Sequence, residues 1–278
     1  AAAKRAGTTS AILFHGYRPI TPTFFEDQDA LGCDRPGFWN VSWRHRLKWP
    51  LVSKTLELYR AAYANADLVV ANSAYVARVI ERFFGREAPV VHPIIDLAPR
   101  PAKAGPQPDG PILFVKPQRI KGVEVLLQVA PHLPDRSFVV TGTGSSRLRA
   151  RLKREPNVAV HGWIEAMEEL YPQCSLLFAP AQIPEPFGRV FVEAAMYGVP
   201  AVATRAGGIP EAVGAGGELL DMRAPPAAWA DAIERVLAPD RYEALSTAAR
   251  AHAAALCETH TPRRLVALLA AAADRTDA

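Results

Sequence analysis

The chain has 278 residues, of which 49% are hydrophobic, so it can bury one large α/β core or two ordinary ones. Its 32 lysines and arginines against 28 aspartates and glutamates give only a mild positive excess, which does not indicate a nucleic-acid-binding protein. No apolar run approaches the roughly 18 residues of a membrane-spanning helix, and three cysteines without ligand spacing indicate reduced thiols, so we expect a cytoplasmic protein.

Residues 1–97 carry the pattern of a small α/β domain. A helix is expected after Ser73, whose hydroxyl is a good N-cap, and it should end at Gly85. Strands are expected at 10–15, 66–71 and 88–92.

The segment FWNVSWRHRLKWP (38–50) interleaves tryptophans with cations. This mixture suits a membrane interface or a lipid-linked acceptor. It would also suit stacking on single-stranded nucleic acid, and the plainest alternative is a helix that packs its tryptophans inward. The residues concerned are Trp39, Trp43, Trp49, Arg44, Arg46 and Lys48.

Residues 98–110 contain four prolines and two glycines and almost no apolar anchor, which is typical of an interdomain linker. From residue 111 to about 258, short β-rich runs alternate with helical patterns, which predicts a parallel sheet with helices on both faces. The basic run RLRARLKR (147–154) is interpreted as a solvated helix face.

The stretch EPFGRVFVE (185–193) places two carboxylates around a glycine. Prolines on both sides of Glu185 stiffen its loop, so this carboxylate is well placed to accept hydrogen bonds from hydroxyls. A helix is expected from about Arg189 to Tyr197, and its free N–H groups beside Gly188 suit a phosphate. Glu193 then lies one turn in. The alternative is an ordinary solvated glutamate at each position.

Cations gather in FVKPQRIKG (114–122), where a strand passes into a helix. Lys116, Arg119 and Lys121 would lie at the carboxyl edge of the sheet, where open α/β folds bind ligands. A diphosphate is the natural anionic guest, and the alternative is an ordinary basic loop. Gly142 begins a G-x-G after another strand, but this short pattern also marks plain tight turns.

Together these motifs resemble the retaining nucleotide-sugar glycosyltransferases of the GT-B fold, the group that includes bacterial glycogen synthases and lipopolysaccharide sugar transferases. The resemblance covers about residues 66–273. It rests on the order of an E-x7-E frame, Glu185 to Glu193, a G-x-P strand start from Gly198, and a G-G-x-x-E loop from Gly207.

The resemblance implies a role for each candidate residue. The first glutamate, Glu185, would contact the donor sugar, and Glu193 would bind the ribose hydroxyls. Backbone amides would meet phosphate or sugar at Phe187, Gly188 and Arg189. Lys121 would hold the diphosphate with Lys116, which stands where the family usually has an arginine and lacks that residue's bidentate fork. Arg119 and Gly142 join the candidate donor site. His15 is the acceptor-side candidate, against an ordinary loop or core histidine.

The resemblance also implies the domain plan: an α/β chain with two Rossmann-like domains (GT-B), the N-terminal one shortened. Residues 1–97 would form a partial acceptor-side domain, because no glycine-rich βα unit opens the chain, and its strand edge would be exposed. Residues 111–258 would form the donor-binding domain. A C-terminal helix in 259–278 would cross back to the N-terminal domain.

The expected function is a hexosyltransferase that moves a sugar from a UDP or GDP donor to a carbohydrate, lipid-linked or small-molecule acceptor, with retained anomeric configuration. No cofactor or obligatory metal is expected, because Lys121 and the helix start would stabilise the leaving diphosphate. The alternatives are a non-catalytic nucleotide-sugar binding module and a sugar-nucleotide epimerase. Peripheral contact with the inner face of the cell membrane is compatible with this function; a nucleic-acid partner is not expected.

Overall fold

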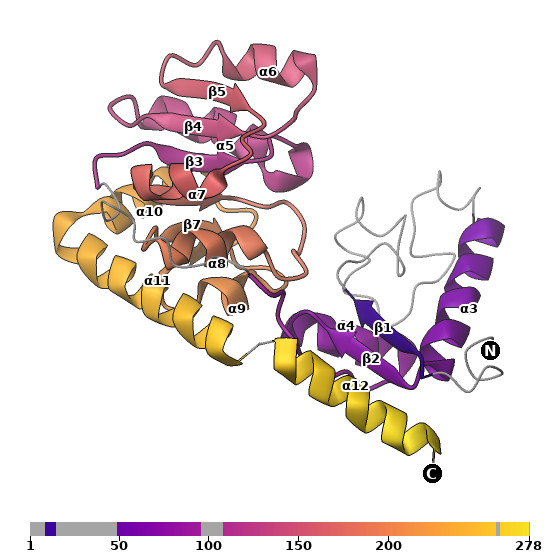
Figure 1. Cartoon of the computed structure of the whole chain (residues 1–278). Coiled ribbons are helices and arrows are strands. Elements are labelled where there is room, and N and C mark those ends of the chain that lie inside the picture. The colour runs from indigo at the N-terminus through magenta and orange to yellow at the C-terminus, as the bar shows by residue number, and fades with distance from the viewer. Residues whose placement is uncertain (1–8, 15–48, 96–107, 260–261, 278) are drawn as a thin grey trace. The chain divides into compact units, whose positions relative to one another are not determined.

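The computed structural model describes residues 9–14, 49–95, 108–259 and 262–277, which form two compact units (Figure 1). Unit 1 comprises Ala1–Ile94 with His260–Ala278, and unit 2 comprises Ile95–Thr259. Several predictions fall outside the described residues: His15, Trp39, Trp43 and most of the expected linker 98–110.

Unit 1 contains a pair of parallel strands, β1 (Ala11–Phe14) and β2 (Leu68–Ala71), in register from Ala11 opposite Leu68. Helix α3 (Trp49–Asn65) precedes β2, and α4 (Ala74–Phe84) follows it. The predicted caps of α4 are confirmed, because the Ser73 hydroxyl accepts from the Val76 N–H and Gly85 ends the helix in the left-handed conformation.

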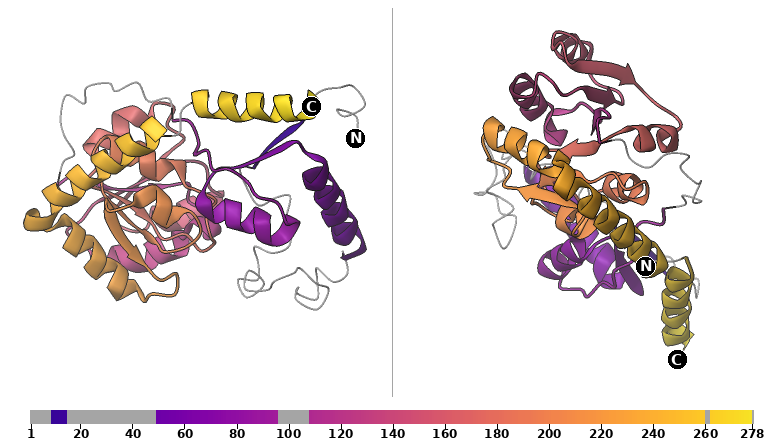
Figure 2. Two further views of the ribbon diagram at one scale, coloured as in Figure 1. Left: turned by 90° about the horizontal axis from the view of Figure 1, so that it is seen from below. Right: turned by 90° about the vertical axis from the view of Figure 1, so that its left-hand side faces the viewer.

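Strand β2 is buried on both of its faces. Val69 and Ala71 face a cluster with residues of α3 and α4, and Leu68 and Val70 face helix α12 (Pro262–Asp277), where Ala272 is buried. This double burial explains the continuous apolar run of β2, which is typical of parallel strands covered on both sides. Figure 2 shows α12, in yellow, as a separate helix after α11 (Pro239–Thr259).

The expected strand at 88–92 is wrong in extent. Within the described residues it forms a single parallel bridge between Val90 and Ala71, held by the Ala71 N–H to Pro89 and the Val91 N–H to Ala71. Pro89 and Pro93 bracket this bridge and have no N–H to donate, so a longer ladder cannot form there.

Unit 2 is built on one six-stranded parallel sheet with the order β5-β4-β3-β6-β7-β8, as the alternating pattern predicts (Figure 1). The strands are β3 (Ile112–Val115), β4 (Phe138–Thr141), β5 (Val158–Gly162), β6 (Leu176–Ala179), β7 (Ala201–Thr204) and β8 (Gly217–Leu220). The connecting helices are η3 (Arg119–Lys121), α5 (Val123–Val129), η4 (Ala130–His132), α6 (Ser146–Leu152), α7 (Met167–Leu170), η5 (Tyr171–Gln173), α8 (Arg189–Met196), α9 (Ile209–Val213) and α10 (Pro226–Leu237).

Each face of this sheet carries its own core. On one face, Ile112 and Phe114 of β3 pack with α5 and α10, around the fully buried Trp229. On the other face, Leu113 packs with α8, α9 and α11. Strand β3 thus contributes to both cores through alternate residues, which places its carboxyl end at the centre of the unit.

The described helices include none that is both long and apolar enough to cross a bilayer. Cys174 is buried and Cys257 is half-buried, and both are free thiols. Burial raises the pKa of the Cys174 thiol to about 12, so this side chain stays protonated and behaves as a small apolar residue.

Candidate functional site

The strand order of unit 2 reverses between β3 and β6. From β3 the chain runs outward through β4 and β5, and it then returns to β6 on the other side of β3 before it continues to β7 and β8. The carboxyl ends of β3 and β6 therefore form a topological switch point, which is where open α/β sheets bind ligands in the crevice outside the strand ends. We call this region, between the loops that follow β3 and β6, the donor crevice. Candidate residues lie on both of these loops.

The loop after β3 approaches the loop after β6 very closely at Gly122. This residue has φ of 84°, and a Cβ atom on it would lie 1.9 Å from the Pro180 carbonyl oxygen. The Gln182 N–H also donates to the Ile120 carbonyl at 2.9 Å. Only glycine permits this approach, which brings the side chain of Lys121 to the other loop.

Lys121 and Glu185 form an ion pair across the crevice, through Nζ and Oε1. Both side chains are largely buried, with 29% of the lysine and 14% of the glutamate exposed. A pair with so little water around it interacts more strongly than a surface salt bridge, and each partner satisfies a charge that would be costly to bury alone. The structure thus joins two residues that are 64 positions apart in the chain.

The backbone of Glu185 is fixed by the glycine-rich loop after β7. Glu185 bridges to Gly207, and the Gly208 N–H donates to the Glu185 carbonyl at 2.7 Å. A Cβ on Gly207, which has φ of 64°, would lie 2.2 Å from that carbonyl oxygen. The G-G-x-x-E loop of the sequence therefore acts as the support that holds the first glutamate in place.

Helix α8 begins at Arg189 after Gly188, as predicted, and Gly188 offers no side-chain cap to the first N–H groups. Phe187 is buried with only 2% of the residue exposed, and its side chain packs in the core cluster that includes α8 and α9. The start of α8 thus presents backbone amides and the positive end of the helix dipole one turn before Glu193.

Glu193 is held by two neighbours. The Tyr171 hydroxyl donates to Oε2 at 2.9 Å, and Arg189 lies 3.3 Å from Oε1 in an i,i+4 pair. Burial, with the adjacent Glu193 carboxylate, raises the pKa of Tyr171 far above its usual value, so its hydroxyl remains a donor. Sequence reasoning missed Tyr171, because nothing in its local sequence indicates a contact with a residue 22 positions away.

The other candidates lie around this centre. Lys116 is exposed at the end of β3 in a left-handed conformation with φ of 61°, and Gly142 packs against it, since a Cβ on Gly142 would lie 3.2 Å from its Cα. The Arg119 side chain is 86% exposed and lies 3.9 Å from Glu124. Among the described residues, no three His, Cys, Asp or Glu side chains gather as they would around a metal ion.

Residues 112–239 match the family model of glycosyl transferases group 1. The chain is 35% identical over 246 residues to the D-inositol 3-phosphate glycosyltransferase of Geodermatophilus obscurus, across 76% of this chain and 54% of that protein. It is 34% identical over 171 residues to the D-inositol 3-phosphate glycosyltransferase of Corynebacterium urealyticum. This match covers 54% of this chain and 40% of that protein. The chain thus spans about half the length of the curated relatives it matches.

Solved structures of similar fold include Anabaena HepE in complex with UDP, with a TM-score of 0.69 and 20% identity over 99% of this chain and 74% of that one. Sucrose-phosphate synthase from Thermosynechococcus elongatus has a TM-score of 0.63 and 21% identity, and the match covers 88% of this chain and 63% of that one. At this identity the likeness establishes the fold alone, and that fold is GT-B.

Proposed function

We propose that the chain transfers a sugar from a nucleoside diphosphate donor to an acceptor hydroxyl, because residues 112–239 match the family model of the group 1 glycosyl transferases and the chain has the GT-B fold. The proposal includes hexosyl transfer with retention of the anomeric configuration, which the group's motifs imply. UDP is the favoured carrier, because HepE, a protein of the same fold, has been crystallised with UDP and with UDP-glucose.

The observation that carries the proposal is the partly buried Lys121–Glu185 ion pair at the switch point of the sheet. A ligand that displaces this pair must offer an anion to the lysine and hydroxyl donors to the carboxylate. A nucleotide sugar offers both on adjacent groups, a diphosphate and a sugar ring. Neither a simple phosphate nor a neutral sugar would replace both partners at once.

The leaving group would be stabilised by Lys121 and the start of α8. The diphosphate gains negative charge as its bond to the sugar breaks, so a fixed ammonium and aligned backbone amides favour the transition state over the ground state. Lys116 would add a second cation beside the diphosphate. This division of labour requires no divalent metal, although Mg²⁺ commonly serves this purpose in other folds.

Glu193 would bind the ribose. Its Oε2 is occupied by Tyr171, which is buried, and its Oε1 by Arg189, whose side chain is 59% exposed. Ribose hydroxyls would therefore replace the exposed arginine and leave the tyrosine contact intact. Tyr171 acts as a positioning residue that fixes the carboxylate plane before the donor binds.

The test is incubation with UDP-glucose, UDP-N-acetylglucosamine and GDP-mannose, with release of nucleoside diphosphate as the readout. The proposal expects slow donor hydrolysis by the intact chain, lost in Lys121→Ala and kept in the control Lys153→Ala, which changes an exposed lysine of unit 2. A sugar altered at one carbon while still attached to the nucleotide would indicate an epimerase instead. Tight binding without turnover of any donor would indicate a binding module.

A further inference from the structure

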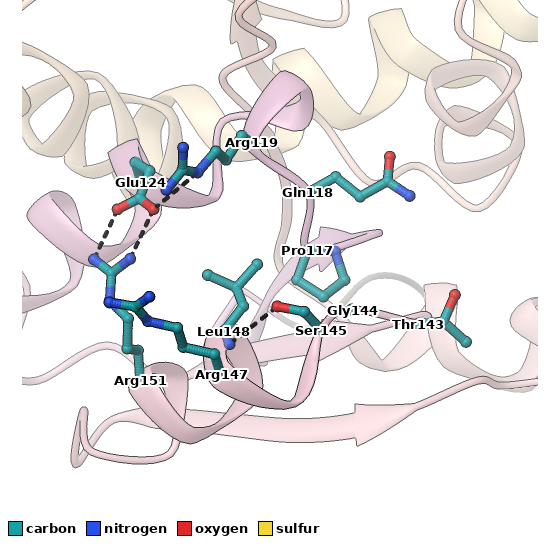
Figure 3. Close-up of a pocket in the computed structure, with 10 residues that line it drawn as sticks. All are labelled: Pro117, Gln118, Arg119, Glu124, Thr143, Gly144, Ser145, Arg147, Leu148 and Arg151. Carbon is teal, nitrogen blue, oxygen red and sulfur yellow. Dashed lines mark hydrogen bonds and ion pairs between the residues drawn. The ribbon is translucent and has the colours of Figure 1, made fainter.

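A hollow lies at the carboxyl edge of the same sheet, between the loops after β3 and β4 (Figure 3). Its volume is about 580 Å³, which falls within the range of small-molecule sites. Its lining includes neither Lys121 nor Glu185 nor Glu193. We call it the arginine pocket, and its lining residues are Pro117, Gln118, Arg119, Glu124, Thr143, Gly144, Ser145, Arg147, Leu148 and Arg151.

Two of the three guanidinium groups of this pocket, those of Arg151 and Arg119, contact a single carboxylate. Arg151 donates two hydrogen bonds of 2.7 Å to Glu124, and Arg119 approaches the same carboxylate at 3.9 Å, as Figure 3 shows. The hydrogen bonds from Arg151 hold the pKa of Glu124 below its ordinary value, so this carboxylate is ionised at neutral pH.

Arg147 lies beside Arg151 on α6 and is the member of the set that makes no hydrogen bond or ion pair with the described residues. Three arginines against one glutamate leave the lining with two positive charges in excess. The charge balance of the donor crevice is different, because there Lys121 and Glu185 neutralise each other. The arginine pocket is therefore already suited to a dianion, without first breaking an ion pair.

The neutral residues of the lining indicate which class of anion would fit the pocket. Thr143 and Ser145 supply hydroxyls, and Gln118 supplies an amide, which suit the hydroxyls of a polyol. The Ser145 hydroxyl accepts from the Leu148 N–H at 3.3 Å and can still donate its own proton. The volume exceeds what a lone phosphate would fill, so the lining has room for a sugar-sized body.

We propose that the arginine pocket binds a phosphate monoester of a small polyhydroxylated molecule, at a site separate from the donor crevice. The planar forks of Arg147 and Arg119 match the oxygens of a phosphate dianion, while Arg151 keeps its two hydrogen bonds to Glu124. The body of the ligand lies toward Thr143 and Gln118. Both sites draw on the turn η3, with Arg119 at the arginine pocket and Lys121 at the donor crevice.

Titration calorimetry with glucose 6-phosphate, on the full chain saturated with UDP, tests the proposal. Because UDP fills the donor crevice, we expect glucose 6-phosphate to bind at one site, inorganic phosphate to bind more weakly, and glucose not to bind. Arg147→Gln should weaken binding about tenfold or more, since it removes a charge-assisted hydrogen bond. Arg149→Gln is the matched control, because Arg149 is an exposed arginine of α6 outside the lining, and it should bind as the native chain does.

Two measurements separate this proposal from the donor site. Lys121→Ala should keep glucose 6-phosphate binding even if it loses UDP binding, and the melting temperature of Arg147→Gln should equal that of the native chain. Affinity should rise from about pH 5 to about pH 8, because a phosphate monoester loses its second proton near pH 6. The proposal is overturned if no phosphate ester saturates the chain, if Arg147→Gln and Arg149→Gln bind equally well, or if UDP displaces the ester.

Discussion

The balance of charged side chains differs between the two sides of β3. Toward β6, one lysine meets one glutamate in a largely buried pair, and glycines hold the surrounding loops in contact. Toward β4, three arginines and one glutamate line an open hollow. A charge-balanced, partly buried pair is fixed in advance and suits a ligand that must be held in one geometry, whereas an exposed excess of charge suits capture of an anion.

Substitution of Lys121 is expected to have the largest effect on the rate of transfer, and it tests the role of the Lys121–Glu185 pair most directly. Lys121→Ala should lower kcat for the transfer reaction by about 10²–10³, by analogy with the loss of one preorganised donor to a developing negative charge. Steady-state kinetics with UDP-glucose and an acceptor would measure it. If Lys121→Ala changed only KM, the Lys121–Glu185 pair would serve donor binding and not the chemical step.

Glu193 should give the next largest effect, and in a different parameter. Ribose hydroxyls gain no charge during the reaction, so Glu193 should bind the ground state and the transition state about equally. Glu193→Ala should therefore raise KM for the donor about tenfold with little change in kcat. Donor-saturation curves would separate the two parameters, and loss of kcat at saturating donor would contradict the assignment.

Tyr171 should show a smaller effect of the same kind. Tyr171→Phe removes the 2.9 Å hydrogen bond that fixes Glu193, so KM for the donor should rise about threefold, as expected for one modest hydrogen bond. Tyr242→Phe is a matched control, because its buried hydroxyl donates to the Ser175 carbonyl at 2.9 Å, away from the candidate site. Equal KM values for the two variants, at similar melting temperatures, would remove Tyr171 from the site.

The smallest expected effect is that of a chelator. If Lys121 and the start of α8 stabilise the leaving diphosphate, EDTA should leave the transfer rate unchanged. The same assay with added Mg²⁺ is the companion measurement. A transfer rate that falls with EDTA and recovers with Mg²⁺ would show that Lys121 and the start of α8 do not stabilise the leaving diphosphate without a metal ion.

Sequence reasoning reached those parts of the site that follow from local pattern. The cap at Ser73, the start of α8 at Arg189 and the parallel sheet after residue 111 all follow from residue types at short spacing, and the structure confirms them. The presence of Lys121 and Glu185 in one crevice was expected only through the family resemblance. Their direct contact depends on how closely two loops pack at Gly122, which no spacing in the chain encodes.

The arginine pocket shows where pattern reasoning fails. The sequence predicts a solvated helix face for the run 147–154, and Arg147, Arg149 and Lys153 are exposed as expected. The pattern does not predict that Arg151 pairs with Glu124, nor that Arg147 lines the hollow. These two arginines lie four residues apart on one helix face, and the missing information was what faces them. Glu124, which accepts both hydrogen bonds from Arg151, lies on α5, and only the fold brings it beside α6.

The path of the chain also sets an order for its folding. Unit 1 buries Leu68, Val70 and Val91 against α12, which is synthesised only after all of unit 2. During translation, unit 2 can complete its six-stranded sheet before this face of β2 is covered. In the nascent chain, this face of β2 therefore lacks its α12 partner until α12 has been synthesised.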